Sequence, residues 1–301
     1  MNIERALKNN RVLKSLTGLN IIAFNKLSVT FEAELSKFNL ENIDTKKRQR
    51  ALGGGRKSKV ETAKEKLFFL LFYFKVYPTF DVAGFLFDAN RSQPFHWVKK
   101  LQQVLERSLK RALVLPKRKI SSVEEFLRLF PEAKDIFIDG VERKTLRPKK
   151  PKASTRKYSG KKKTHTRKNI VITNEKRKIL VVTKSKNGKM HDKKILDKAN
   201  IMQYIPKDFT LWVDKGFKGI NKLTNATVMM PKFNSKKNPL TKSEKENNAV
   251  ISGIRMLVEH AIGGVKRFAI IANPFRNKNG SDDKVTELCA GLWNYHLEFS
   301  K

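Results

Sequence analysis

Cysteine, long apolar runs and acidic residues are all scarce in this chain of 301 residues. The only cysteine, Cys289, lies in the apolar run ELCAGLW, which predicts a buried, inert thiol and excludes an internal disulfide. The longest apolar run, LFFLLFYF at residues 67–74, is too short to span a bilayer. The N-terminus lacks the continuous apolar core of a signal peptide. We therefore expect a soluble, cytoplasmic protein without a membrane partner.

The shortage of acidic residues leaves a large positive charge. Lys and Arg number 65 against 28 Asp and Glu, which gives a net charge of +37. Such an excess repels itself unless a polyanion is nearby, and nucleic acid is the usual polyanion. An anionic membrane surface is the alternative, but it normally requires a basic amphipathic helix or a lipid anchor, and neither is evident. The apolar content, 40%, is ordinary for a folded protein.

The first third of the sequence has helical periodicity. Residues 1–50 are predicted to be helical and weakly amphipathic, and the glycine-rich stretch GGGRKSK at 53–59 follows. This stretch is either a linker between domains or a flexible segment that follows a DNA backbone, and the linker is the preferred interpretation.

Three helices are predicted between residues 60 and 110. The first is apolar and ends near Pro78, the short second has Thr79 as its N-cap, and the third begins with Ser92 as its N-cap. This order is typical of a helix-turn-helix, although a plain three-helix bundle with a solvated basic face has the same outline. In the helix-turn-helix, the early exposed positions of the third helix would face the major groove of DNA; these are Gln93, His96, Lys99 and Lys100.

Beyond residue 118 the pattern changes to alternating strands and helices. We expect a short strand at 135–143 that ends in a turn at Asp139-Gly140, a hairpin at 169–185 and a helix beginning at His191. A strand leading to Asp214, a further strand closed by Pro231 and a long final helix follow. This succession predicts an α/β domain with a mixed sheet.

Residues 143–168 form a basic run with 13 Lys or Arg and no acidic residue. A charge run of this kind is usually a solvated surface. Because it directly follows an aspartate at a strand end, a phosphate-binding arm is at least as good an interpretation. Lys161, Lys162 and Lys163 are its candidate DNA contacts.

Three carboxylates occupy the ends or faces of regular elements: Asp139, Asp214 and Glu259. Cutting or joining a phosphodiester requires an activated water or hydroxyl and a stabilised leaving oxygen, which two Mg²⁺ ions about 4 Å apart provide. Magnesium prefers hard oxygen ligands and keeps several waters, so two or three carboxylates are sufficient. Either aspartate taken alone is better explained as a turn residue.

Glu259 is flanked by Arg255 and Lys266 in the segment RMLVEHAIGGVKRF. At about 100° per residue the three side chains fall within roughly 40° of one another, at the border of the apolar face of the helix. An intrahelical salt bridge between Arg255 and Glu259 is the simple explanation. Placement beside the buried face favours a metal ligand between two phosphate-binding cations.

Several blocks together resemble a known family. The blocks YFKVYPTFDVAGFLFD, DGVERKTLRPKK, YSGKKKTHTRKN, HDKKILD, DKGFKG, RMLVEHAIGGVKRF and GLWN, in this order, resemble the DDE transposases of bacterial insertion sequences, in the insertion-sequence-five group related to the Harbinger elements. The resemblance covers residues 58–301. Ser252 stands where the wider superfamily has a tyrosine.

The resemblance implies an α/β fold in which an all-α helix-turn-helix DNA-binding domain at 53–118 precedes a ribonuclease-H-like catalytic domain with a mixed sheet at 119–301. An N-terminal helical segment would occupy residues 1–52. Asp139, Asp214 and Glu259 would hold two Mg²⁺ or Mn²⁺ ions, and Arg255 and Lys266 would contact DNA. His191 and Asp192 match a His-Asp block whose expected role is structural or substrate-orienting.

The implied function is that of a transposase. It would bind the terminal inverted repeats of its own element, cut there in a metal-dependent reaction and join the ends to target DNA, as a homodimer or larger assembly associated with the bacterial nucleoid. The alternatives are an inactive relic that only binds DNA, a stand-alone metal nuclease and a ribosomal-type RNA-binding protein. The intact set of three carboxylates disfavours the relic and the RNA-binding protein.

Overall fold

The computed structural model describes residues 1–42, 57–131, 133–277 and 281–300. The chain divides into two compact units, each described by itself. The first consists of Met1–Leu115, Arg267–Ile270 and Asn294–Lys301, and the second of Pro116–Lys266 and Ile271–Trp293. The domain border that we predict at residue 52, and most of the predicted linker, lie outside the described residues. The domain borders stay a prediction.

The first unit is helical, as expected. Its complete helices are α1 (Ile3–Lys8), α2 (Asn10–Thr17), α3 (Ile21–Glu41), α4 (Ala63–Val76), α5 (Phe80–Leu86) and α6 (Ser92–Arg111). In α4 a capping box joins Thr62 and Glu65, and eight consecutive residues, 67–74, are buried. The helix is therefore the centre of this unit, which explains why it is apolar on all sides.

The turn between α5 and α6 depends on a glycine. A Cβ atom at Gly84 would lie 2.6 Å from the carbonyl oxygen of Ala89, so a larger residue would push the turn open. Thr79 caps α5 through a bond from the Val82 amide, as predicted. The predicted N-cap at Ser92 is wrong, because α6 already includes Ser92 and Arg91 precedes it without a side-chain cap bond.

The second unit is built on a mixed sheet in the strand order β2-β3-β1-β6-β7, and β4 and β5 also pair with β3. Its strands are β1 (Asp135–Lys144), β2 (Tyr158–Ser159), β3 (Thr164–Asn174), β4 (Ile179–Val182), β5 (Lys186–Asn187), β6 (Thr210–Val213) and β7 (Thr227–Met229). Its helices are α7 (Val123–Leu129), α8 (Pro151–Lys157), α9 (Asp192–Ala199) and α10 (Lys242–Lys266), with short 3-10 turns η1 (Met202–Tyr204), η2 (Lys215–Phe217) and η3 (Ile220–Lys222). The mixed α/β class is confirmed. Two further helices, α11 (Ala269–Ala272) and α12 (Ser281–Glu298), contain residues of both units.

The strand β1 is longer than predicted. It pairs antiparallel with β3 as far as Lys144, so Gly140 faces Ile170 within a ladder and the predicted turn at Asp139-Gly140 is wrong. Its parallel pairing with β6, in contrast, ends at the pair Ile138 and Val213. Among the described residues, the edge of β1 on the β6 side therefore has no strand partner from Asp139 to Arg143, and Phe275 then donates to the Lys144 carbonyl at 2.9 Å.

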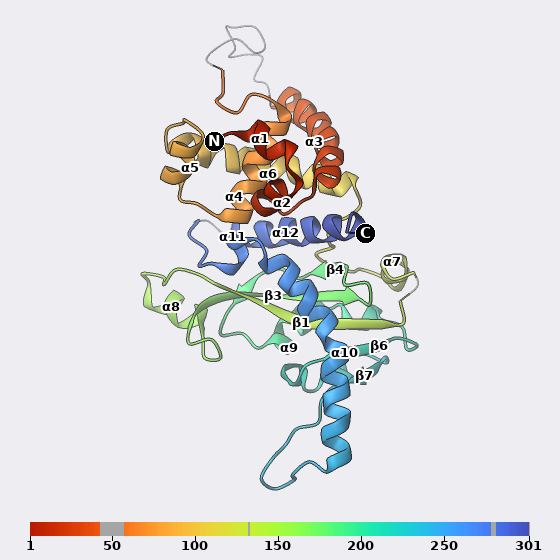
Figure 1. The fold of residues 1–301 in the computed structure, drawn as a ribbon. Coiled ribbons are helices and arrows are strands. Elements are labelled where there is room, and N and C mark those ends of the chain that lie inside the picture. The colour runs from red at the N-terminus through yellow and green to blue at the C-terminus, as the bar shows by residue number, and fades with distance from the viewer. Residues whose placement is uncertain (43–56, 132, 278–280, 301) are drawn as a thin grey trace. The chain divides into compact units, whose positions relative to one another are not determined.

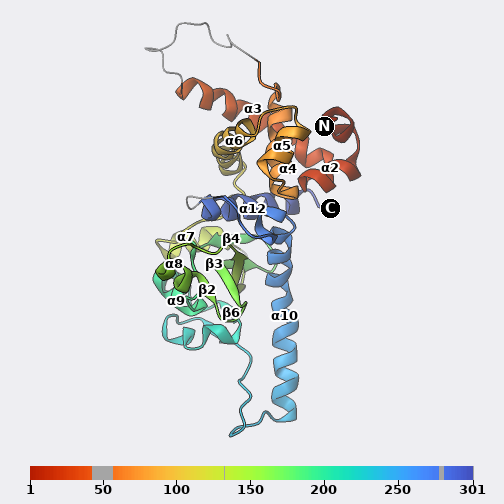
Figure 2. The same ribbon diagram turned by 90° about the vertical axis from the view of Figure 1, so that its left-hand side faces the viewer.

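Helices cover both faces of the sheet, with α10 on one side and α9 on the other (Figure 2). Ile136 and Ile138 of β1 share a core with Ile195 and Leu196 of α9. Because side chains alternate along a strand, Asp139 points toward the α10 face and Gly140 toward the α9 face. The carboxylate of β1 thus lies on the side where α10 runs.

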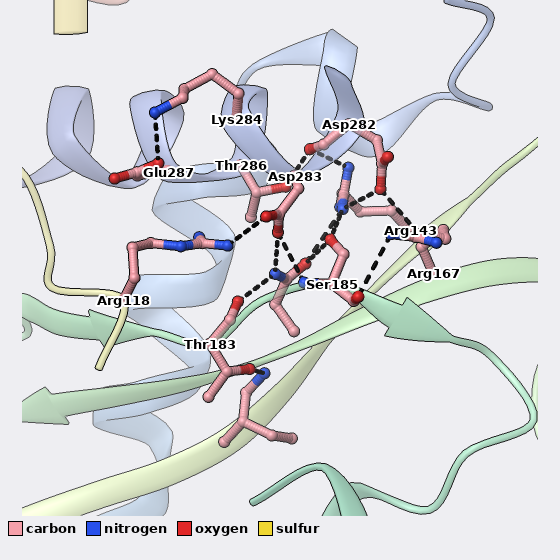
Figure 3. A network of polar contacts seen from close by, with 12 residues as sticks. Arg118, Arg143, Arg167, Thr183, Ser185, Asp282, Asp283, Lys284, Thr286 and Glu287 are labelled. Atoms are coloured by element: carbon pink, nitrogen blue, oxygen red, sulfur yellow. Dashed lines mark hydrogen bonds and ion pairs between the residues drawn. The ribbon is translucent and has the colours of Figure 1, made fainter. Parts of the chain in front are cut away.

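A buried polar network fixes the start of α12 to the sheet (Figure 3). The Arg143 guanidinium, with a fully buried side chain, donates to the Asp282 carbonyl at 2.8 Å and to its carboxylate at 3.1 Å. The same guanidinium donates to Asn169 and Ser185, and Arg167 reaches the Asp282 carboxylate from a second direction at 3.0 Å.

The adjacent carboxylate extends this network. Asp283 accepts from the Ser185 amide at 2.7 Å and from the Arg118 guanidinium at 2.6 Å, so two neighbouring acidic residues bind three arginines from different segments. Arg143 and Arg167 belong to the basic run that we interpret as a phosphate-binding arm. For these two arginines that interpretation is wrong, because both are partners of a carboxylate inside the fold.

No helix within the described ranges is both long and apolar enough to cross a membrane.

Candidate functional site

Asp139 and Asp214 lie at equivalent positions of neighbouring strands. Each follows directly on the last parallel pair of β1 and β6, Ile138 with Val213. Asp139 accepts a bond from the Gly140 amide at 2.7 Å, and Asp214 accepts one from the Gly216 amide at 2.5 Å. The two carboxylates therefore emerge side by side from the same end of the paired strands, although 74 residues separate them in the chain.

Glu259 comes from α10, which packs on β1 and β6. Val258, Ala261 and Ile262 of this helix are buried, whereas Glu259 is exposed. The simple explanation of Glu259 as a salt-bridge partner of Arg255 fails, because no ion pair joins them among the described residues, and the Nε of Arg255 is buried without a hydrogen-bond partner. Both side chains face a common hollow.

That hollow is a cavity of about 430 Å³ in the second unit. It brings together all three predicted carboxylates and four of the predicted DNA contacts. The residues that line it are Asp139, Gly140, Glu142, Lys161, Lys162, Asp192, Asp214, Arg255, Glu259, Ile262, Gly263 and Lys266.

A fourth carboxylate, Asp192, lies between the two aspartate-bearing strand ends. A Cβ atom at Gly140 would lie 3.3 Å from its carboxyl carbon, and one at Gly216 would lie 3.8 Å from its Oδ2. The glycines beside Asp139 and Asp214 thus leave room for the Asp192 carboxylate. Asp192 begins α9 and lines the cavity wall.

The sequence did not identify Lys168, which contacts Asp192, or its partner Glu142 as residues of this site. They are register partners on β3 and β1, and the Lys168 ammonium lies 3.3 Å from Asp192 and 3.9 Å from Glu142. Lys168 is 7% exposed, so this pair of contacts holds Asp192 from inside the fold. The available signal was Glu142, the acidic residue that immediately precedes the basic run.

The electrostatics of the cavity favour a cation. Burial raises the pKa of Asp139, and the neighbouring carboxylates Asp214 and Asp192 raise it further, against the lowering effects of the Gly140 amide and of Arg255. A carboxylate that resists ionisation because of burial and like charges is stabilised in its charged form by a positive ion.

The donor set fits a hard divalent ion. Asp139, Asp214 and Glu259 offer carboxylate oxygens, the ligands that Mg²⁺ and Mn²⁺ prefer, and the cations that line the same cavity can hold a phosphate. Within the described residues, no three carboxylate, imidazole or thiol groups are grouped closely enough to form a complete metal site. Asp139, Asp214 and Glu259 line the same cavity from β1, from the residue after β6 and from α10.

The remaining predicted DNA contacts do not line this cavity. Lys163 is exposed in the turn between β2 and β3, with a left-handed backbone (φ 49°). The other four are on α6 in the first unit, where Lys100 donates to Asn39 of α3 at 2.7 Å. His96 and Lys99 are exposed, and Gln93 is partly buried. Their role as DNA contacts stays a prediction.

The comparisons with known proteins identify the family of the chain. Residues 138–294 match the family described as DDE superfamily endonuclease. Over 301 residues, covering 99% of both chains, the sequence is 26% identical to a protein of Microchaete diplosiphon named "Probable transposase for insertion sequence element IS702". No solved structure matches the chain. The family match begins at the residue before Asp139 and spans more than half of the sequence, and the chain therefore belongs to the DDE superfamily of endonucleases.

Proposed function

We propose that the protein is the transposase of a bacterial insertion sequence of the insertion-sequence-five group, and that it binds the terminal inverted repeats of its element, cleaves the DNA there and transfers the strand to a target. The observation that carries this proposal is the single cavity in which Asp139, Asp214 and Glu259 face Arg255 and Lys266. The family match and the named relative support it. The family also implies a ribonuclease-H-like fold for the catalytic part.

In this proposal Asp139, Asp214 and Glu259 hold two Mg²⁺ or Mn²⁺ ions. Such ions, when bound, lower the pKa of a coordinated water or hydroxyl and neutralise charge on the phosphate under attack. Asp192 lies beside Gly140 and Gly216, near the two aspartates, and is paired with Lys168. The pairing of β1 with β6 makes the spacing of the first two ligands rigid, because both side chains belong to paired strands.

The cations of the cavity bind and orient the DNA. Arg255 and Lys266 lie on the same helix as Glu259, and Lys161 and Lys162 reach the cavity from the turn between β2 and β3. The buried Arg255 Nε has no partner within the fold and is free to donate to a phosphate oxygen. Cations on two sides of the carboxylates fix a phosphodiester for in-line attack by water, and then by the freed 3′-hydroxyl.

Recognition of the DNA ends is assigned to the helical first unit. The exposed side of α6 carries His96 and Lys99, and Gln93 lies near Phe85, which is 86% exposed. Amide, imidazole and ammonium groups are the usual readers of base edges and phosphates. Because both ends of an element must be held for joining, we propose a homodimer or larger assembly on DNA.

The test is cleavage and strand transfer on duplexes that carry the gene's own flanking ends. The wild type should cut and join these ends with Mg²⁺ or Mn²⁺ and not with EDTA, and it should leave duplexes with scrambled ends intact. Glu259→Gln should bind the ends with unchanged affinity and cut none. If the wild type binds the ends without cutting them, the protein is an inactive DNA-binding relic.

Exchanging Gly140 for alanine should lower cleavage while the fold stays intact. The new methyl group would press on the Asp192 carboxylate at about 3.3 Å and displace it against Lys168. A displacement of a few tenths of an ångström beside the ligands should cost roughly ten- to a hundredfold in the cleavage rate. Gly253→Ala, where the methyl group meets nothing within 4 Å, is the matched control. Equal rates for both variants would contradict the placement of Asp192.

A further inference from the structure

A second cavity lies beside the catalytic one and has no role in the proposed chemistry. Its volume is about 620 Å³, within the range of ligand pockets. The residues that line it are Arg147, Ser154, Thr155, Tyr158, Gly160, His165 and Lys189. These residues contribute two aromatic rings, three hydroxyl groups and two cations, and none of them is a carboxylate, so the cavity suits a ligand that is flat at one end and anionic at the other.

The aromatic wall of this cavity is built by one hairpin. Tyr158 of β2 and His165 of β3 are register partners, and their ring centres lie 5.6 Å apart in an edge-to-face contact. The Ser154 hydroxyl lies 2.8 Å from the His165 Nε2 and fixes the imidazole. Tyr158 keeps 44% of its surface exposed. The imidazole of His165 is therefore held in place, and the ring of Tyr158 packed edge-to-face with it leaves part of its surface available for stacking.

The same hairpin also forms a wall of the catalytic cavity. Gly160 lines the second cavity, and the next two residues, Lys161 and Lys162, line the catalytic one. Consecutive residues are about 3.8 Å apart along the chain, so the two cavities share this short turn as their common wall. A DNA strand with a phosphate at Lys161 and Lys162 would have its neighbouring nucleotide within reach of Tyr158.

We propose that the second cavity receives an unstacked nucleobase of the bound DNA end, next to the phosphate to be cut. The base stacks on Tyr158 beside His165, and Arg147 and Lys189 contact its phosphates. Aromatic side chains are the usual platforms for unstacked bases, and removing a base from the duplex gives a catalytic site access to the adjoining backbone. This inference rests on the proposed function and adds to it a nucleotide subsite.

The experiment measures the affinity of the full-length protein, in EDTA, for a set of duplexes with the gene's flanking ends. Each duplex carries one abasic nucleotide at a successive position around the expected cut. On the intact duplex, Tyr158→Ala should bind about tenfold more weakly than the wild type, because one stacking contact is lost. At one abasic position the two proteins should bind equally, since no base is left to stack. Tyr158→Phe, which keeps the ring, should behave like the wild type at every position.

Phe233→Ala is the matched control, because Phe233 is 47% exposed in the same unit and lines neither cavity. It should show no dependence on the abasic position. The inference is overturned if the tenfold ratio for Tyr158→Ala is the same at all positions, or if Phe233→Ala shows the same loss of the ratio. If the wild type binds the ends and cuts them normally in Mg²⁺, such a result leaves the proposed function intact. A wild type that binds no duplex overturns both.

Discussion

Asp139→Asn removes DNA cleavage, by about a thousandfold or more, and leaves the folded protein at least as stable as the wild type in EDTA. The loss of activity is expected because Asp139 is a proposed metal ligand, and charge stabilisation by a bound metal is worth several kcal/mol in the transition state. Cleavage rates on the flanking ends with Mg²⁺ measure it. Asp135→Asn is the matched control, since Asp135 begins the same strand and its oxygen accepts from the Trp212 indole at 2.6 Å, which an asparagine oxygen also does.

The stability half of this prediction depends on pH. Because the folded-state pKa of Asp139 is raised, chiefly by burial, the folded state favours the neutral carboxyl. Its contribution to stability is present below the unfolded-state pKa of about 3.9 and is lost as the pH rises above that value. In metal-free urea unfolding, the free energy of unfolding of the wild type should therefore fall relative to that of Asp139→Asn as the pH rises from about 4 to 7. A variant less stable than the wild type at pH 7 would contradict this assignment.

Arg143→Met lowers the free energy of unfolding of the second unit by about 3 kcal/mol or more. The Asp282 side chain is only 7% exposed, and the substitution leaves its carboxylate with Arg167 as the remaining arginine partner. It also removes the hydrogen bonds that Arg143 donates to Asn169 and Ser185. Removing one partner of a buried ion pair typically costs about 3–5 kcal/mol, because the other charge stays buried without compensation. Urea unfolding at pH 7 measures the change.

Two further variants separate the network from a general effect of removing charge. Arg156→Met changes an exposed arginine of the same basic run and should alter stability by less than about 0.5 kcal/mol. The double variant Arg143→Met with Asp282→Asn should regain part of the loss, because the uncompensated charge is gone. If Arg143→Met costs no more than Arg156→Met, the network does not hold the start of α12 on the sheet.

Much of this protein is determined by local sequence. The apolar segment before Pro78, the strands ending at Asp214 and Pro231 and the long basic-bordered helix around Glu259 are each specified by periodicity and by residues that stop an element, and the structure has them at nearly the predicted bounds. The three carboxylates were identified because each occurs at an element end or helix border, where a side chain is held rigidly. The resemblance of the sequence to the transposase family points to the same three residues.

Tertiary structure decided which side chains meet. The turn predicted at Asp139 is a continuing strand because β3 offers a ladder partner to Gly140, and no local signal shows that partner. Arg143, Arg167, Lys161 and Lys162 belong to the same basic run, yet the two arginines pair with Asp282 and the two lysines line the cavity that contains Asp139. Strand pairing and burial decide this difference. A lysine or arginine in a charge run is free for DNA only where the fold leaves it without a carboxylate, and the Asp282 carboxylate lies 115 residues beyond Arg167 and 139 residues beyond Arg143 in the chain.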